Sequence, residues 1–295
     1  MSTNLIKINE HKHGFLDFGA AAADCVTENR DLFEEFLARG HHGSMSYLER
    51  NLEKRFDPRL LVPDARSVLC FLAPYGQAGG GVAGFAQGID YHKVVKDRLF
   101  AQIMELKEQF PSFSGRPFVD SAPLLERWWA VRCGLGFIGR NHFFISPKYG
   151  LRTIIGVIVC NIPAELFPPH EPLAVTDCGG CGRCLEACPT GALREKAGFD
   201  ARKCISYRTV ESHDPADASA DAHHGWKFGC EECMRACPWD KPLDPLPEFE
   251  THRDRIAALS AAPEGKGWAA LDPESFASEF GDSGLTRAGL EKLSH

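Results

Sequence analysis

Eight of the twelve cysteines lie between residues 178 and 237, and their spacing constrains this chain more than any other feature. The segment CGGCGRCLEACP (178–189) matches a bacterial [4Fe–4S] pattern, in which a tight loop of three cysteines binds one cluster and the fourth binds the other. A second, shorter motif is CEECMRACP (230–238). Two clusters are therefore predicted, the first held by Cys178, Cys181, Cys184 and Cys237 and the second by Cys188, Cys204, Cys230 and Cys233.

A structural zinc site is the alternative for these cysteines. Such sites typically use pairs of cysteines separated by a longer loop, whereas three cysteines in residues 178–184 followed by Cys-Pro fit a cubane better. A reducing cytoplasm also argues against a disulfide framework. The remaining cysteines have no such spacing and are predicted to be small buried hydrophobic residues; they are Cys25, Cys70, Cys133 and Cys160.

Composition indicates a globular chain, since 44% of its 295 residues are hydrophobic and 25% are charged. The N-terminus lacks the apolar run of a signal peptide, and the longest apolar stretch, about residues 153–162, is too short to cross a membrane. We therefore expect a cytoplasmic protein with no membrane partner. The net charge of −7 disfavours indiscriminate nucleic-acid binding, although the 178–208 segment is basic.

Hydrophobic periodicity predicts an α+β fold with an N-terminal α/β domain. Strands are predicted at 66–74 and 116–120, helices at 31–40, 91–110 and 123–133, and a hairpin where 142–146 and 151–160 flank Pro147–Gly150. A proline-rich linker follows Asn161. Three regions are expected: a catalytic domain at 1–165, a ferredoxin-like double-cluster domain at 166–250 and a helical tail at 251–295.

Two clusters transfer electrons but do not define a reaction, so the chemistry is expected in the N-terminal domain. Segments across most of residues 30–290 resemble epoxyqueuosine reductase, the cobalamin-dependent enzyme of queuosine-tRNA synthesis. The matching segments are RFDPRLLVPDARSV (55–68), DYHKVVKDRL (90–99), FVDSAPLLERWWAVRCGLGFIGRN (118–141), SPKYG (146–150), CGGCGRCLEACPTGAL (178–193), RKCISYRTVE (202–211) and FGCEECMRACPWD (228–240).

The resemblance implies that residues 1–165 bind cobalamin in a domain related to reductive dehalogenases. It implies that epoxyqueuosine at the tRNA wobble position is reduced to queuosine by cob(I)alamin, with electrons delivered through the two [4Fe–4S] clusters. The expected partners are tRNA bearing epoxyqueuosine and an external low-potential electron donor, and the chain is expected to be a monomer.

The sequence departs from the family pattern in three places. Many members carry a further C-terminal helical-repeat domain that helps to bind tRNA, and this chain ends at His295 without room for it. Arg140 stands where lysine is frequent, and His142 where a small hydroxyl residue is usual. The missing domain bears on tRNA affinity more than on the chemistry. Basic residues beside the cysteines could contact RNA phosphates or form a solvated face; they are Arg202, Lys203 and Arg208.

The acid that matches the family is Asp120, which ends a predicted strand and precedes Ser121-Ala122-Pro123. Position alone favours a helix N-cap. The resemblance instead implies that Asp120 donates a proton to the epoxide oxygen as the ring opens. To hold a proton at neutral pH, this carboxyl would have to be desolvated or lie close to another negative group.

The resemblance also suggests cofactor or substrate contacts from six residues: Arg55, Tyr91, His92, Asp120, Arg127 and Phe144. Taken alone, the arginines could be solvated charges and a single histidine is more often structural than a ligand. GLGFIG (134–139) fits a dinucleotide-binding motif literally but follows a predicted helix, which excludes that interpretation. Its glycines are expected to let the backbone approach a flat corrin ring.

Two other functions remain open from the sequence. The chain could be a two-cluster, ferredoxin-type electron carrier with an N-terminal docking domain, or a cobalamin-dependent reductase of another small epoxide or halide. A carrier would need neither a corrin nor Asp120, so cobalamin binding distinguishes it from both enzymes.

Overall fold

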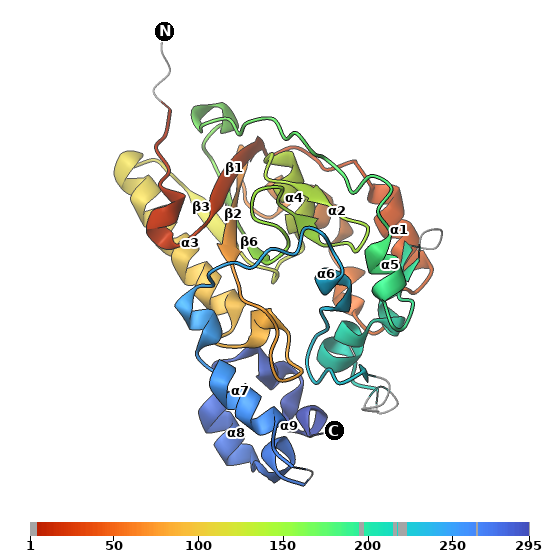
Figure 1. Cartoon of the computed structure of the whole chain (residues 1–295). Coiled ribbons are helices and arrows are strands. Elements are labelled where there is room, and N and C mark those ends of the chain that lie inside the picture. The colour runs from red at the N-terminus through yellow and green to blue at the C-terminus, as the bar shows by residue number, and fades with distance from the viewer. Residues whose placement is uncertain (1–4, 195–197, 215–216, 218–222, 264, 295) are drawn as a thin grey trace. The chain divides into compact units, whose positions relative to one another are not determined.

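The computed structural model describes residues 5–194, 198–214, 217, 223–263 and 265–294. The chain forms two compact units (Figure 1). Unit 1 comprises Met1–Glu35, Leu48–Pro74 and His92–Cys181. Unit 2 comprises Phe36–Tyr47, Tyr75–Tyr91 and Gly182–His295. Two segments from the N-terminal half of the chain thus belong to the unit that contains six of the eight cysteines of residues 178–237.

A four-stranded antiparallel sheet forms the centre of unit 1. Its order is β1-β2-β6-β3, with β1 at Asp17–Ala22, β2 at Ser67–Pro74, β6 at Thr153–Cys160 and β3 at Gly115–Phe118. Every residue of β2 is buried. A strand that is covered on both faces has to be apolar throughout, which explains the uninterrupted run SVLCFLAP and confirms the strand predicted at 66–74.

Helices α3 (Tyr91–Gln109) and α4 (Glu126–Arg132) pack on opposite faces of this sheet. On one face α3 approaches so closely that a Cβ atom on Gly156 would lie 2.9 Å from Val95. On the other face the fully buried Trp129 of α4 joins a core with Val157 and Val159. Adjacent residues of a strand point to opposite faces, so Gly156 and Val157 separate the two helices.

The smaller elements of the N-terminal half surround this core. They are α1 (Arg30–Ala38), α2 (Leu52–Phe56), β4 (Phe137–Ile138) and β5 (Phe144–Ile145). The predicted hairpin of 142–146 with 151–160 is wrong: β5 pairs with β4, and β6 pairs with β2 and β3. Only an isolated bridge between Ser146 and Gly150 closes the turn that the sequence indicated.

Three of the four cysteines outside the motifs are buried, as predicted: Cys70, Cys133 and Cys160. The Cys133 thiol donates to the carbonyl oxygen of Val68 at 3.5 Å, which ties the end of α4 to β2. Cys25 is half-buried and packs at the edge of the same core.

Unit 2 is built from short elements. Around the cysteines these are α5 (Arg183–Ala187), β7 (Leu193–Arg194), β8 (Gly198–Phe199) and α6 (Glu232–Arg235). Helices α7 (Arg253–Ser260), α8 (Pro273–Phe280) and α9 (Gly289–Leu293) lie together in the C-terminal part, drawn in blue in Figure 1. They enclose an apolar core that includes Ile256, Trp268 and Phe280.

A buried carboxyl organises the glycine-rich segment of unit 2. Glu231 is 1% exposed and accepts hydrogen bonds from the backbone N–H groups of Gly84 at 2.7 Å and Ala78 at 3.4 Å. The segment 75–91 is therefore held by the residue next to Cys230. Backbone donors satisfy the carboxyl, as a charge at this depth requires.

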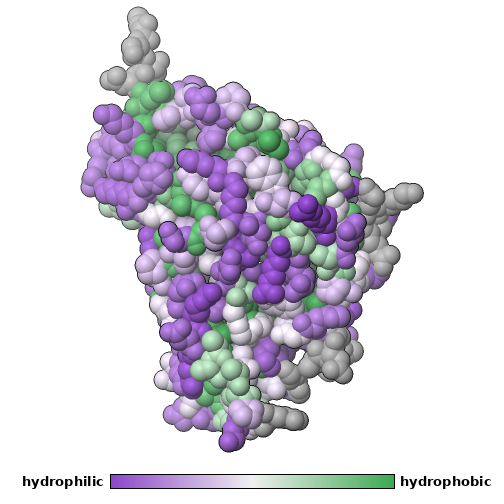
Figure 2. Space-filling view, in the orientation of Figure 1, coloured by the Kyte–Doolittle hydropathy of each residue, from purple (hydrophilic) through white to green (hydrophobic). Residues whose placement is uncertain are grey.

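Hydrophilic side chains, in purple, predominate on the face in Figure 2, with smaller hydrophobic areas between them. None of the helices in the described part of the chain is both long and apolar enough to span a bilayer.

Candidate active site and cysteine ligand sets

The loop between β3 and α4 presents Asp120. Phe118 and Val119 are buried in unit 1, and the chain then turns so that Asp120 is exposed. Asp120 has a φ of +48°, in the left-handed region that side-chain-bearing residues seldom adopt. A backbone held in this conformation costs energy, and such residues gather at functional sites.

Asp120 is not a helix cap, although its position in the sequence favoured that role. Helix α4 begins at Glu126 rather than near Pro123, its N-cap position is Leu125, and no side chain caps it. The intervening residues form a series of bends. The DSAPLL segment is therefore a loop between strand and helix, and replacing Asp120 removes no helix cap.

Glu126 is the carboxyl that sequence reasoning missed. Its Oε1 accepts a hydrogen bond from the backbone N–H of Asp120 at 3.1 Å. Burial, followed by the negative charge of Asp120, raises the pKa of Glu126 to about 8. Glu126 therefore holds its proton at neutral pH. The only signal in the sequence was a second acid six residues after Asp120, and helix-initiating acids are too common for that to be diagnostic.

Arg127 anchors a second loop beside the first. Its guanidinium donates to the backbone carbonyl oxygen of His142, which also has left-handed backbone, with a φ of +62°. Desolvation by the surrounding protein disfavours the charged imidazolium, and the positive charge of Arg127 adds to this effect. Together they lower the pKa of His142 to about 4. His142 is therefore neutral at physiological pH. The structure thus brings Asp120, Glu126, Arg127 and His142 together around the start of α4.

The other predicted cofactor contacts have different surroundings. Arg55 is 7% exposed at the end of α2, and Phe144 is 4% exposed within the core that contains Trp129. His92 is half-buried in α3 of unit 1. Tyr91 belongs to unit 2, where its ring meets Phe85 edge-on at 5.9 Å.

The glycines of GLGFIG have a local packing role. A Cβ atom on Gly136 would lie 2.1 Å from the carbonyl oxygen of Ile145, and one on Gly139 would lie 2.6 Å from the Ile145 side chain. The β4–β5 ribbon itself thus requires both glycines. The approach of this backbone to a corrin ring stays a prediction.

The second predicted cysteine set is brought together inside unit 2. Burial raises the pKa of Cys230 to about 12, and the negative charges of Cys204 and Cys188 add to this effect. Burial also raises the pKa of Cys233, with further contributions from Cys230, Cys204 and Cys188. Such mutual interactions indicate that the four thiols lie in the same region of unit 2. Among the described residues, no group of three or more cysteine, histidine or acidic side chains is arranged to hold a single metal ion.

Cys188 has surroundings that favour a thiolate. Burial alone would raise its pKa, but backbone N–H groups of Leu193 and Ala192 and the Thr190 hydroxyl face the sulfur and hold its pKa below the ordinary value. The Sγ of Cys188 and Oγ1 of Thr190 are 3.7 Å apart. Hydrogen bonds to ligand sulfurs are one of the ways in which proteins tune iron–sulfur clusters.

The first predicted cysteine set begins at the end of unit 1. Gly179 has a φ of +55° and donates its N–H to Asp177 at 2.6 Å, which starts the cysteine loop. The Arg140 guanidinium donates to the carbonyl oxygen of Cys181 at 2.8 Å. This arginine, noted above as a departure from the family pattern, therefore fixes the backbone of a predicted ligand. Cys184 and Cys237 belong to unit 2.

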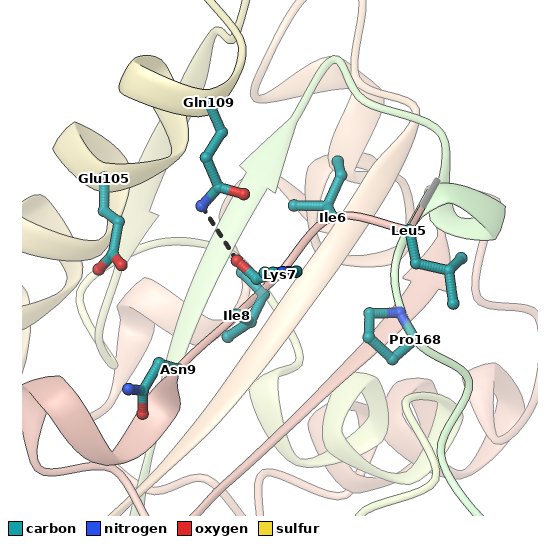
Figure 3. Close-up of a pocket in the computed structure, with 8 residues that line it drawn as sticks. All are labelled: Leu5, Ile6, Lys7, Ile8, Asn9, Glu105, Gln109 and Pro168. Atoms are coloured by element: carbon teal, nitrogen blue, oxygen red, sulfur yellow. Dashed lines mark hydrogen bonds between the residues drawn. The ribbon is translucent and has the colours of Figure 1, made fainter. Parts of the chain in front are cut away.

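Two further surfaces carry none of the predicted catalytic residues. A groove of about 930 Å³ in unit 1 lies between the N-terminal segment and α3, where Gln109 donates to the Lys7 carbonyl oxygen at 3.0 Å (Figure 3).

In unit 2, Arg202 is exposed but bonds Asp200 at 2.9 Å, and Arg208 lies 3.5 Å from Asp217. The basic segment is therefore partly neutralised by its own acids.

Comparisons with known proteins agree with these observations. A family model described as 4Fe-4S double cluster binding domain matches residues 177–240, and one described as epoxyqueuosine reductase QueG, DUF1730, matches residues 55–121. An epoxyqueuosine reductase from Cyclobacterium marinum is 33% identical, and the alignment covers 98% of this chain and 93% of that protein.

Solved structures give the same result for the fold. An epoxyqueuosine reductase in complex with an epoxyqueuosine-modified tRNA-Tyr stem loop superposes with a TM-score of 0.80 at 26% identity, covering 97% of this chain and 76% of that one. An enzyme from Bacillus subtilis, solved with its catalytic aspartate loop swung out of the active site, gives a TM-score of 0.80 at 25% identity, covering 97% and 77%.

Proposed function

Because the chain belongs to the epoxyqueuosine reductase family, a family of oxidoreductases, we propose that it reduces epoxyqueuosine to queuosine at the wobble position of tRNA. The observation that carries this proposal is the loop at Asp120. An exposed carboxyl on left-handed backbone, anchored to the start of α4, can be presented to a substrate, and we propose that it becomes a proton donor when the bound substrate and cofactor desolvate it. The aspartate loop named in the B. subtilis enzyme is proposed to correspond to residues 119–125 here.

Residues 177–240 match a double [4Fe–4S] cluster binding domain, and we propose that Cys188, Cys204, Cys230 and Cys233 hold one cluster. In support, these thiols influence one another's pKa, and Cys188 has donors directed at its sulfur. Cys178, Cys181, Cys184 and Cys237 are proposed to hold the other cluster, with Arg140 fixing the loop at Cys181. An external low-potential donor would supply the electrons.

Cobalamin is proposed as the cofactor that acts on the substrate. When bound, it would supply a strongly reducing cobalt centre to the epoxide carbon. We propose that it binds next to the start of α4, where the exposed side chains of Asp120, Arg127 and His142 would face it. Left-handed backbone at two of these three residues is typical of a ligand site.

The residues of this chain have definite tasks in the reaction. Removal of the epoxide oxygen as water consumes two electrons and two protons. Asp120 would protonate the oxygen as its bond to carbon breaks, because a developing alkoxide is a poor leaving group. Arg127 would keep the His142 loop in place. His142 would remain neutral and leave the positive charge of the site to Arg127.

The tRNA substrate is proposed from the relative that was solved with a modified stem loop. We propose that the reaction takes place in the cytoplasm, where a tRNA substrate would be met. Unit 2 offers a modest basic surface around Arg202, Lys203 and Arg208, so binding is expected to be weak and to decrease with salt.

The proposal is tested with anaerobically reconstituted protein. Iron, sulfide and cobalamin are added, epoxyqueuosine-tRNA and a reductant are supplied, and the nucleosides are identified by mass spectrometry. Queuosine that forms only when cobalamin is present supports the proposal. Full clusters without cobalamin binding or product would instead favour an electron carrier.

A further inference from the structure

Both loops of the site depend on one support. Asp120 and His142 each have left-handed backbone, and each is held through a backbone atom by the first turn of α4. The two anchors, Glu126 and Arg127, are consecutive in sequence. A helix bonded into the core through Trp129 is a rigid support, so the conformations of both loops are set by the same element.

We propose that Glu126 is a positioning residue for the reduction: its carboxyl fixes the backbone of Asp120 so that the acid is presented to the substrate. This inference rests on the proposed function, in which Asp120 is the proton donor. Glu126 acts through Asp120 and needs no contact with the substrate.

The geometry explains why the anchor is a side-chain oxygen. The N–H of Asp120 points back to Glu126, so the left-handed turn is stabilised by a bond that a regular helix or strand would not provide. Without this bond, an aspartate at a φ of +48° would relax toward ordinary backbone conformations. The Asp120 side chain would then leave its position.

The charge of the anchor also matters. The titratable and charged groups that act on or respond to Glu126 are Asp120, Arg127 and Cys70. At neutral pH Glu126 is protonated, so it holds the Asp120 backbone without adding a negative charge beside the acid. Above about pH 8 it ionises, and the Asp120 N–H then bonds to a charged carboxylate. Glutamine keeps the acceptor oxygen and the neutral state.

Three variants separate these effects. Glu126→Ala removes the acceptor, Glu126→Gln keeps it, and Glu108→Ala is a matched control at an exposed position of α3 in the same unit. With pre-reduced cofactor, E126A should lower the single-turnover rate by about 10²-fold, the loss typical of a misplaced reacting group. E126Q should retain most of the rate at pH 7, because it keeps the acceptor oxygen and the neutral state. E108A should match the parent.

Hydrogen exchange gives a readout that does not depend on turnover. E126A should accelerate amide exchange in the segment 119–125 and leave β6 unchanged, whereas E126Q should preserve protection. If E126A exchanges and reacts like the parent, or if folded E126Q is as slow as E126A at pH 7, Glu126 does not position Asp120. If the parent forms no queuosine but the exchange pattern holds, the proposed function has failed and the anchoring has not.

Discussion

The sheet of unit 1 and the cysteine segments of unit 2 are stabilised in different ways. In unit 1, strands of up to eight residues and two helices bury a continuous apolar core around Trp129. Around the cysteines of unit 2, α5 has five residues, α6 has four, and β7 and β8 have two each. Elements this short are unstable alone. We therefore expect Asp120 to be held by the packed helix α4 through its bond to Glu126, and the cysteine segments to depend on their ligands for order.

Trp129→Ala is the most severe test of the packing side of this comparison. Trp129 is a residue of α4, and its side chain is fully buried in the core that α4 shares with the sheet. Truncation of a buried aromatic residue typically costs about 3–5 kcal/mol of unfolding free energy. Denaturant unfolding of the full chain, monitored by hydrogen exchange in β2 and β6, should show the same loss of unfolding free energy with and without iron. A loss seen only in the iron-loaded protein would contradict a metal-independent core.

Cys230→Ser tests the ligand side. Serine preserves size but is a poor cluster ligand, so one of two clusters should be lost. Iron analysis after anaerobic reconstitution should give about four iron atoms per chain instead of about eight. Exchange should increase in residues 198–214 and 223–240, while β2 stays protected. Cys160→Ser, in the buried β6 strand, is the control and should retain all the iron.

The raised pKa of Glu126 predicts a pH-dependent difference in stability. In the folded state Glu126 keeps its proton up to about pH 8, but in the unfolded state it releases it near 4.5. Between these values the unfolded chain binds fewer protons, so the contribution of Glu126 to stability falls as pH rises. Glu126→Gln does not titrate. Its Tm relative to the parent should therefore rise from pH 5 to pH 8, and a constant difference would refute the raised pKa.

The smallest effect is expected at the basic surface. Arg202 is bonded to Asp200, so its charge is already compensated. Lys203→Ala should reduce the slope of log affinity against log salt by about 1 if Lys203 contacts a phosphate, and Arg202→Ala should reduce it less. Binding of epoxyqueuosine-tRNA at several salt concentrations measures both slopes. Equal slopes for parent and variants would exclude these residues from the RNA contact.

The comparison also explains what the sequence could predict. Cysteine ligands are recognisable because cluster geometry imposes short, fixed spacings, and the buried strand at 66–74 was recognisable from its apolar run. The role of Glu126 as the anchor of Asp120 could not be recognised from the sequence, because the bond between the two residues depends on where α4 begins. Pro123 suggested an earlier start, but the chain instead bends through residues 120–125.

Long-range pairing set the other limit. Residues 142–146 and 151–160 have the composition of a hairpin, yet β6 pairs with β2 because that arrangement buries all of β2 and the last five residues of β6. Likewise, the glycine-rich segment 75–91 has no pattern that links it to unit 2. Its place there is explained by bonds to distant residues, such as those from the N–H of Gly84 to Glu231 and from the N–H of Ala83 to the carbonyl oxygen of Phe228.

The central claim is that Asp120 supplies the proton that opens the epoxide, and Asp120→Asn tests it most directly. Asparagine tolerates left-handed backbone and retains the N–H that bonds Glu126, so the loop should keep its conformation. The measurement is single-turnover queuosine formation with pre-reduced cofactor, which bypasses electron delivery. The expected result is full cluster content, intact cobalamin binding and a rate lowered by about 10²–10⁴-fold. Turnover at a near-parental rate would contradict the claim and place the acid elsewhere.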